Sequence, residues 1–199
     1  MFKCFHVYMM IVLYGVNNLG KTTQAKKLVE RLHAESYSAE YIKYPIYDLE
    51  PSGPRLNAYL RRENPEHLTP EQAQLLYIEN RTAYEPTLKA KLAAGVHIVA
   101  EDYTGTGIAW GMGAGVSEAL LKEKNAHLIK EDLAFLFEGE RFTASTESNH
   151  AHETNDALLE KVRRAHRQLG RELGWRVVNA NRSVDEIHEE IWLAIRQRL

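Results

Sequence analysis

A glycine-containing loop lies directly between an apolar run and an amphipathic run near the start of this 199-residue chain. The apolar run is Val7–Tyr14, the loop covers residues 15–22, and the amphipathic run is Lys21–Glu35. Apolar residues recur on one face of the second run, so the order predicts a strand, a tight turn and a helix. Apolar and amphipathic runs continue to alternate along the chain, which is typical of a parallel sheet covered by helices.

The residues of this loop follow the pattern G-x-x-x-x-G-K-[ST] of a phosphate-binding loop, or P-loop. Its glycines let the backbone approach an anion, and the N–H groups that open the helix point at it. We expect Lys21 to reach the β- and γ-phosphates of ATP and Thr22 to ligate Mg²⁺. The residues predicted to bind ATP here are Gly15, Val16, Asn17, Asn18, Leu19, Gly20, Lys21, Thr22 and Thr23. The alternative is a tight turn in which Lys21 is only solvated.

Two acidic residues, Glu101 and Asp102, follow the predicted strand Val96–Ala100. Ligands bind beyond the carboxyl ends of the strands in open parallel sheets, and Mg²⁺ prefers oxygen ligands. We therefore predict a metal site made by Thr22, Glu101 and Asp102. Because neighbouring strand residues point to opposite faces, we expect only one of the two carboxylates to face the metal. The alternative is a solvated strand end.

The remaining elements follow from the same alternation. We expect further strands at 40–44, 132–137 and 176–179, and helices at 55–62, 155–173 and 183–198. A capping box at Thr69 starts another helix, which should break or kink before Pro86 and resume to Ala94. No helix is expected to open at Gly105 and Gly107. The result is one α/β domain over residues 1–199, with a five-stranded parallel sheet between helices and a short lid at about 139–154.

Composition narrows the class of partner. The formal net charge of −2 gives no reason to expect a nucleic-acid partner. No apolar run is long enough to span a bilayer, so no membrane partner is expected. Cys4 is the only cysteine, which excludes an internal disulfide and fits a cytoplasmic protein. These features favour a small-molecule substrate.

Segments along nearly the whole chain resemble the thymidylate kinases, P-loop enzymes that phosphorylate dTMP to dTDP. The segments are 15–32, Tyr44-Pro45, Leu75-Leu76-Tyr77, Asn80-Arg81, Glu101-Asp102-Tyr103, 106–110 and 179–183. The resemblance implies a P-loop NTPase fold and a homodimer. It also implies direct in-line transfer of a phosphoryl group from Mg²⁺-bound ATP to the nucleotide.

The resemblance also implies roles for individual residues. Tyr77 would stack on the base, Arg81 would bond its edge, and Tyr103 would lie against the sugar. The other residues implied to bind substrate or adenine are Tyr44, Pro45, Gly107, Ala180, Asn181 and Arg182. Two plainer alternatives stay open, a core role for Tyr77 and a surface ion pair for Arg81.

Several arginines of the family pattern are missing here. Asp102 occupies the place of the arginine that normally clamps the acceptor phosphate, and residues 46–48 lack a second arginine. Residues 143–154 contain none, and the nearest arginine is Arg141. Such a group can be worth several powers of ten in rate. We therefore expect Arg55, with Lys43 and Arg81, to bind the acceptor phosphate. The predicted catalytic residues are Lys21, Glu101, Asp102 and Arg141.

Other functions remain open at this point. The missing arginines favour a kinase for another deoxynucleotide or for a nucleoside. A P-loop module that binds nucleotide without transferase activity is a second possibility, although a guanine-reading N-K-x-D segment is lacking. His150 and His152 could ligate a metal, but no third ligand is evident, so we expect solvated lid residues.

Overall fold

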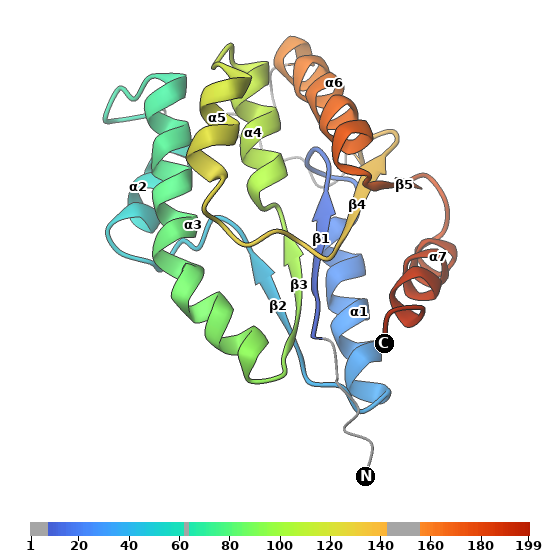
Figure 1. Ribbon diagram of the computed structural model, residues 1–199. Helices are drawn as coiled ribbons and strands as arrows, with labels where there is room; N and C mark the ends of the chain where they lie inside the picture. Colours follow the sequence, from blue (N-terminus) through green and yellow to red (C-terminus); the bar gives the residue numbers. More distant parts are fainter. Residues whose placement is uncertain (1–7, 62–63, 143–155) are drawn as a thin grey trace.

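The computed structural model describes residues 8–61, 64–142 and 156–199. Five parallel strands form one sheet in the order β2-β3-β1-β4-β5, with helices on both faces (Figure 1). The strands are β1 (Met10–Tyr14), β2 (Ala39–Lys43), β3 (His97–Glu101), β4 (Leu133–Glu138) and β5 (Arg176–Asn179). The predicted α/β class and parallel sheet are confirmed.

Seven helices cover the sheet in the part of the chain that the structure describes. They are α1 (Lys21–Ala34), α2 (Ser52–Arg61), α3 (Pro70–Ala93), α4 (Thr104–Gly113), α5 (Glu118–Asn125), α6 (Asp156–Leu173) and α7 (Val184–Arg196). Helices α1 and α7 pack together on one face, whereas α3, α4 and α6 lie on the other (Figure 1). None of these helices is long and apolar enough to cross a membrane.

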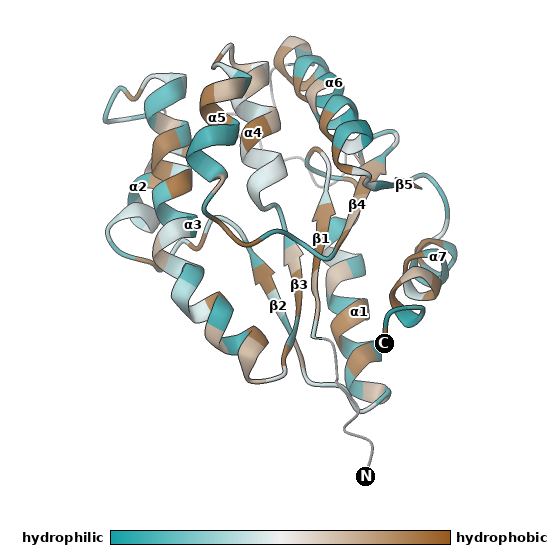
Figure 2. Ribbon diagram, in the orientation of Figure 1, coloured by the Kyte–Doolittle hydropathy of each residue, from teal (hydrophilic) through white to brown (hydrophobic). Residues whose placement is uncertain are grey.

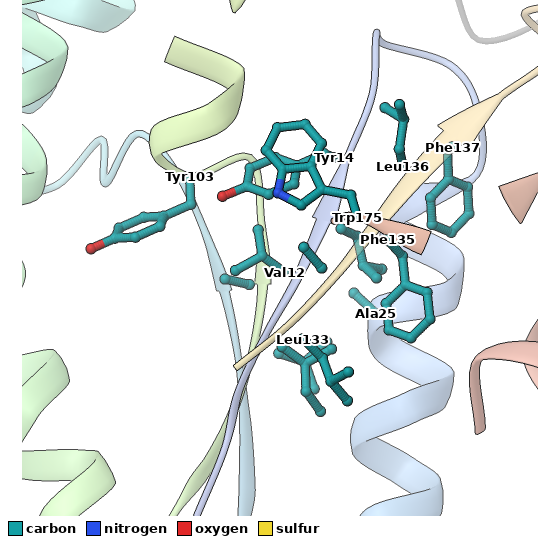
Figure 3. Packing of buried hydrophobic residues seen from close by; sticks show 14 of the residues in the cluster. Val12, Tyr14, Ala25, Tyr103, Leu133, Phe135, Leu136, Phe137 and Trp175 are labelled. Atoms are coloured by element: carbon teal, nitrogen blue, oxygen red, sulfur yellow. The ribbon is translucent and has the colours of Figure 1, made fainter. Parts of the chain in front are cut away.

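The core lies on both sides of the central strand β1. All five residues of β1 are buried, as expected for a strand that is paired on both edges and covered on both faces. Figure 2 shows that the strands are largely hydrophobic, whereas many helical residues are hydrophilic. At the end of β1, the rings of Tyr14 and Trp175 stack with centroids 4.1 Å apart (Figure 3). This packing fixes the point at which the P-loop leaves the sheet.

The register of the sheet brings distant segments together. Leu13 of β1 pairs with Glu101 of β3 on one side and with Phe135 of β4 on the other. The residues that follow these strands therefore meet at the same edge of the sheet. The P-loop, which follows β1, and Asp102, which follows β3, both lie at this edge.

The predicted break before Pro86 is wrong, because α3 is one continuous helix, whereas the alternative of a kink agrees with Figure 1, in which α3 bends along its length. Proline removes one helical hydrogen bond, but the neighbouring side chain of Glu85 anchors this turn. Its carboxylate accepts from the Ile129 N–H at 2.8 Å and from the Tyr103 hydroxyl at 3.3 Å, and it lies 3.2 Å from the Lys89 ammonium. Tertiary contacts thus hold the helix together.

Helices α4 and α5 were not predicted, and the expectation that no helix opens at Gly105 and Gly107 is wrong. The sequence of α4 holds four glycines, which individually disfavour a helix. Their small size is needed for packing instead. A Cβ on Gly105 would lie 2.4 Å from Trp175, and one on Gly113 would lie 2.6 Å from Val162.

Candidate functional site

The P-loop wraps closely around the end of β1. Gly15 has φ +132°, and a Cβ there would lie 2.7 Å from the Phe137 carbonyl oxygen. Gly20 has φ +81° and caps the N-terminus of α1. Both positions therefore require glycine. The sequence pattern supplies glycine at the two places where the backbone must turn, and α1 begins directly behind the loop.

Lys21 holds this loop closed. Its buried ammonium donates to the carbonyl oxygens of Gly15 at 2.9 Å and Val16 at 2.8 Å. It also lies 3.6 Å from Asp102 Oδ1. The alternative of a merely solvated lysine is therefore wrong. Residues 17–23 of the predicted ATP-binding set line one cavity of about 430 Å³.

Glu101 stands beside the loop at the end of β3. Its Oε2 accepts hydrogen bonds from the hydroxyls of Thr22 and Tyr41, both at 2.7 Å. Its Oε1 accepts from the Lys43 ammonium at 3.0 Å. Burial alone would raise the pKa of Glu101, but the charges of Lys21 and Lys43 and these hydrogen bonds hold the pKa below its ordinary value. This carboxylate is therefore charged at neutral pH.

Asp102 lines the same cavity as Glu101, although only one of the two carboxylates was expected to face the metal. The strand ends at Glu101, and Asp102 has φ +60°, so the alternation of a strand no longer applies. Thr106 donates a hydrogen bond of 3.0 Å to Asp102 Oδ1. Burial raises the pKa of Asp102; Lys21 lowers it, and the charge of Glu101 raises it further.

The other end of the cavity is lined by Tyr44, Pro45, Tyr77, Arg81, Tyr103 and Gly107. Arg81 is only 3% exposed, and its Nη2 donates to Asn125 Oδ1 at 3.1 Å. Among the described residues no carboxylate pairs with Arg81, and its Nε has no hydrogen-bond partner. Burial lowers the pKa of Arg81 to about 10, against the opposing effect of tyrosines that include Tyr103. The alternative of a surface ion pair is therefore wrong.

Tyr77 combines the two expected roles. It is 9% exposed, it packs in a small apolar cluster with Leu56 and Leu60, and it lines the cavity. The core alternative and the site prediction for Tyr77 are thus not exclusive.

Two predicted arginines do not line the cavity. Arg55 lies on the surface, where it donates to both carboxylate oxygens of Glu66 at 2.7–3.1 Å. Arg141 is half-buried but is not among the described residues around the cavity. Arg61, the last residue of α2, lines the cavity in place of Arg55. The expectations for Arg55 and Arg141 are therefore not met by their positions.

Of the three residues expected to bind adenine, two line the cavity and one does not. Ala180 and Arg182 line the cavity, and Arg182 forms an ion pair with Glu190. Asn181 does not line it, but its Oδ1 accepts from the Glu140 N–H at 3.0 Å. This bond joins the loop to the start of the predicted lid. Residues 143–155, with His150 and His152, lie outside the described part of the chain.

The lining residues that were not singled out from the sequence include Leu60, Arg61, Gln74 and Phe142. Gln74 lies one helical turn before Tyr77, so helical spacing from the predicted base-stacking residue could have found it. Phe142 had no comparable signal. Its N–H donates to the Asn18 carbonyl oxygen at 2.9 Å, which ties it to the P-loop.

The loop end of the cavity is lined by P-loop residues together with lysine ammonium, threonine hydroxyl and carboxylate groups. The Thr22 hydroxyl and the carboxylates of Glu101 and Asp102 are hard oxygen ligands of the kind that Mg²⁺ takes together with phosphates. In the described residues no group of three or more His, Cys, Asp or Glu side chains could hold a metal ion. The three oxygen donors of Thr22, Glu101 and Asp102 leave room for further ligands from a polyphosphate.

Comparisons with known proteins agree with this geometry. The family model described as thymidylate kinase matches residues 13–191. The chain is 33% identical to a human thymidylate kinase over 187 residues, which cover 92% of this chain and 87% of the human protein. It is 27% identical to a probable thymidylate kinase of Methanocaldococcus jannaschii, with 92% and 93% covered. The fold is similar to that of a Candida albicans thymidylate kinase, with a TM-score of 0.76, 20% identity, and 96% and 92% covered.

Proposed function

The chain belongs to the thymidylate kinase family, whose enzymes phosphorylate dTMP with ATP, and we propose that its cavity carries out this transfer in line. ATP binds at the P-loop end, and dTMP binds at the end lined by Tyr77 and Arg81. The observation that carries the assignment is that one continuous cavity joins Lys21 to a buried guanidinium.

The P-loop amides and Lys21 bind the β- and γ-phosphates of ATP. Thr22, with Glu101 and Asp102, would hold Mg²⁺, which neutralises charge on the phosphates. Ala180 and Arg182 lie against the adenine. The amides and the lysine are in place before substrate arrives, because Lys21 is already held by two loop carbonyls.

The acceptor nucleotide brings its own nucleophile. Tyr77 lies against the base, Arg81 donates to its edge, and Tyr103 lies against the sugar. An oxygen of the acceptor phosphate forms a bond to the γ-phosphorus of ATP while the bond to the β–γ bridging oxygen breaks, which releases ADP. This oxygen carries no proton that must be removed, so the protein acts by positioning and charge neutralisation.

We assign the acceptor phosphate to Lys43 and Arg61, which line the cavity, in place of Arg55. The expected lid at about residues 139–154 lies for the most part outside the described residues. A homodimer and a cytoplasmic location complete the proposal, on the ground of family membership.

Incubation of the purified protein with Mg²⁺ and ATP, and with dTMP, dUMP or thymidine offered separately, tests this function. We expect dTDP and ADP in equal amounts from dTMP, measured by ion-exchange chromatography. Faster phosphorylation of thymidine would instead assign a nucleoside kinase, which the missing arginines favour. ADP without a phosphorylated acceptor would contradict both.

A further inference from the structure

A second polar side chain besides Arg81 is buried at the acceptor end of the cavity. Gln74 of α3 is 6% exposed and lines the cavity. Its side-chain oxygen, Oε1, has no hydrogen-bond partner among the described residues. A buried amide oxygen without a partner costs free energy, typically about 1–3 kcal/mol. A ligand in the cavity that donates a hydrogen bond would remove that cost.

Gln74 and Arg81 lie on the same side of α3. They are seven residues apart, which is about two turns, and Tyr77 lies between them at one turn from each. A flat ring against Tyr77 would therefore lie within reach of both the amide of Gln74 and the guanidinium of Arg81. Both side chains are long enough to bend toward that ring.

Helix α4 leaves room for these two side chains. A Cβ on Gly107 would lie 2.8 Å from Arg81 Nη2, and one on Gly111 would lie 2.6 Å from Leu121 of α5 and 3.1 Å from Gln74 Cγ. The two glycines are four residues apart, so they lie on one face of α4. Each glycine thus faces one of the two polar side chains across the contact between α3 and α4.

Together the two side chains present an ordered pair of groups. Arg81 can only donate hydrogen bonds, and Gln74 Oε1 can only accept them. A thymine or uracil ring carries an acceptor at O4 and a donor at N3–H, which match this pair. Cytosine has a donor at the 4-amino group and a lone pair at N3, so both contacts would be reversed.

We propose that Gln74 Oε1 accepts the N3–H of the acceptor base and thereby determines its specificity for thymine or uracil over cytosine. The inference rests on the proposed function, because it places the base of the acceptor against Tyr77. It assigns Gln74 to base selection and leaves transfer itself to the loop end.

The test is a double-mutant cycle in which one change is made in the substrate. Wild type and Gln74→Met are compared on dTMP and on dTMP methylated at N3. Methylation should lower kcat/KM of the wild type by about thirtyfold or more, because a site built around a hydrogen bond rejects a ligand that lacks it. In Gln74→Met the same methylation should cost less than about threefold, since methionine keeps the length but offers only a weak sulfur acceptor in place of the amide oxygen.

Two further readouts separate this role from a structural one. The KM for ATP should be unchanged in Gln74→Met, and selectivity for dTMP over dCMP should fall about tenfold. Gln168→Met, at an exposed glutamine of α6, is the matched control and should change neither quantity. If Gln74→Met does not fold, Gln74→Asn, which shortens the amide by one methylene, should weaken the discrimination at N3 in the same direction.

An equal loss of kcat/KM on N3-methylation in wild type and variant would overturn the role of Gln74. It would not contradict the proposed kinase function. A wild-type enzyme that phosphorylates no pyrimidine monophosphate would overturn the proposed function, and this inference with it.

Discussion

The loop end of the cavity is built from consecutive residues, whereas the acceptor end is built from side chains of four separate helices between Ser52 and Asn125. Residues 15–22 turn around one anion site at the end of β1, and the sheet register adds two carboxylates. The acceptor end needs α2, α3 and α4 to lie together, with α5 behind them to bind Arg81. Charge is concentrated at the first end, whereas the second buries the guanidinium of Arg81, which pairs with no carboxylate among the described residues.

Lys21→Met tests the loop end and should have the largest effect. Loss of the ammonium removes the charge at the β- and γ-phosphates, so kcat should fall about a thousandfold. The fold should persist, because the methionine stem still fills the same buried space. Steady-state kinetics and thermal unfolding measure the two quantities. The control is Lys26→Met, on the exposed face of the same helix, and equal losses in both variants would contradict the assignment.

Arg81→Met tests the acceptor end. Because the buried guanidinium lacks a carboxylate partner in the described part of the chain, its hydrogen bonds are available to the base. Loss of such a charged hydrogen bond should raise the KM for dTMP about fiftyfold, with little change in the KM for ATP. Arg55→Met, at an exposed ion pair, should change the KM less than twofold. A larger increase in the KM for dTMP in Arg55→Met than in Arg81→Met would support the role that the sequence predicted for Arg55.

The pH dependence of stability tests the packing of His166 behind the loop end. This buried histidine of α6 lies in a small hollow with Gly15 and Val16, and burial, with the charge of Lys21, lowers its pKa to about 3. In the unfolded chain the pKa is ordinary, so the unfolded state binds the extra proton first and stability falls as pH drops below about 6.5. Between pH 8 and pH 5 the expected loss is about 2 kcal/mol. Denaturant unfolding measures it, and His166→Phe should lose correspondingly less.

Asp102→Asn gives the smallest expected effect and tests the residue that replaces an arginine. Asparagine keeps the size and can still accept from Thr106, but it removes the charge beside Lys21. If Asp102 helps to hold the metal, kcat should fall about tenfold at saturating Mg²⁺. Asp185→Asn, at an exposed ion pair of α7, serves as the control. An increase in kcat would show that the negative charge opposes transfer.

The same difference between the two ends decides what could be predicted from the sequence. The P-loop, both capping boxes and the strands depend on residues close together in the chain, and these predictions were correct. Local spacing could also place Glu101 at a strand end. It could not show that Asp102 leaves the strand with a positive φ and turns into the same cavity.

The acceptor end depends on packing between helices that sequence patterns do not describe. Helix α4 was missed because its glycines disfavour a helix, although Gly107 and Gly111 are what allow α3 to approach it. Arg55 was expected in the cavity because of its charge, but Glu66 holds it at the surface. Which arginine of α2 faces the cavity depends on the helix orientation, and this favours Arg61.

The most direct test of one cavity with two ends is a crystal structure with adenosine and thymidine joined by a polyphosphate chain, in the presence of Mg²⁺. We expect the phosphates to be bound by the amides of residues 15–22 and by Lys21, with thymine between Tyr77 and Arg81. A polyphosphate bound away from this loop, or a base outside the contact between α3 and α4, would contradict the account.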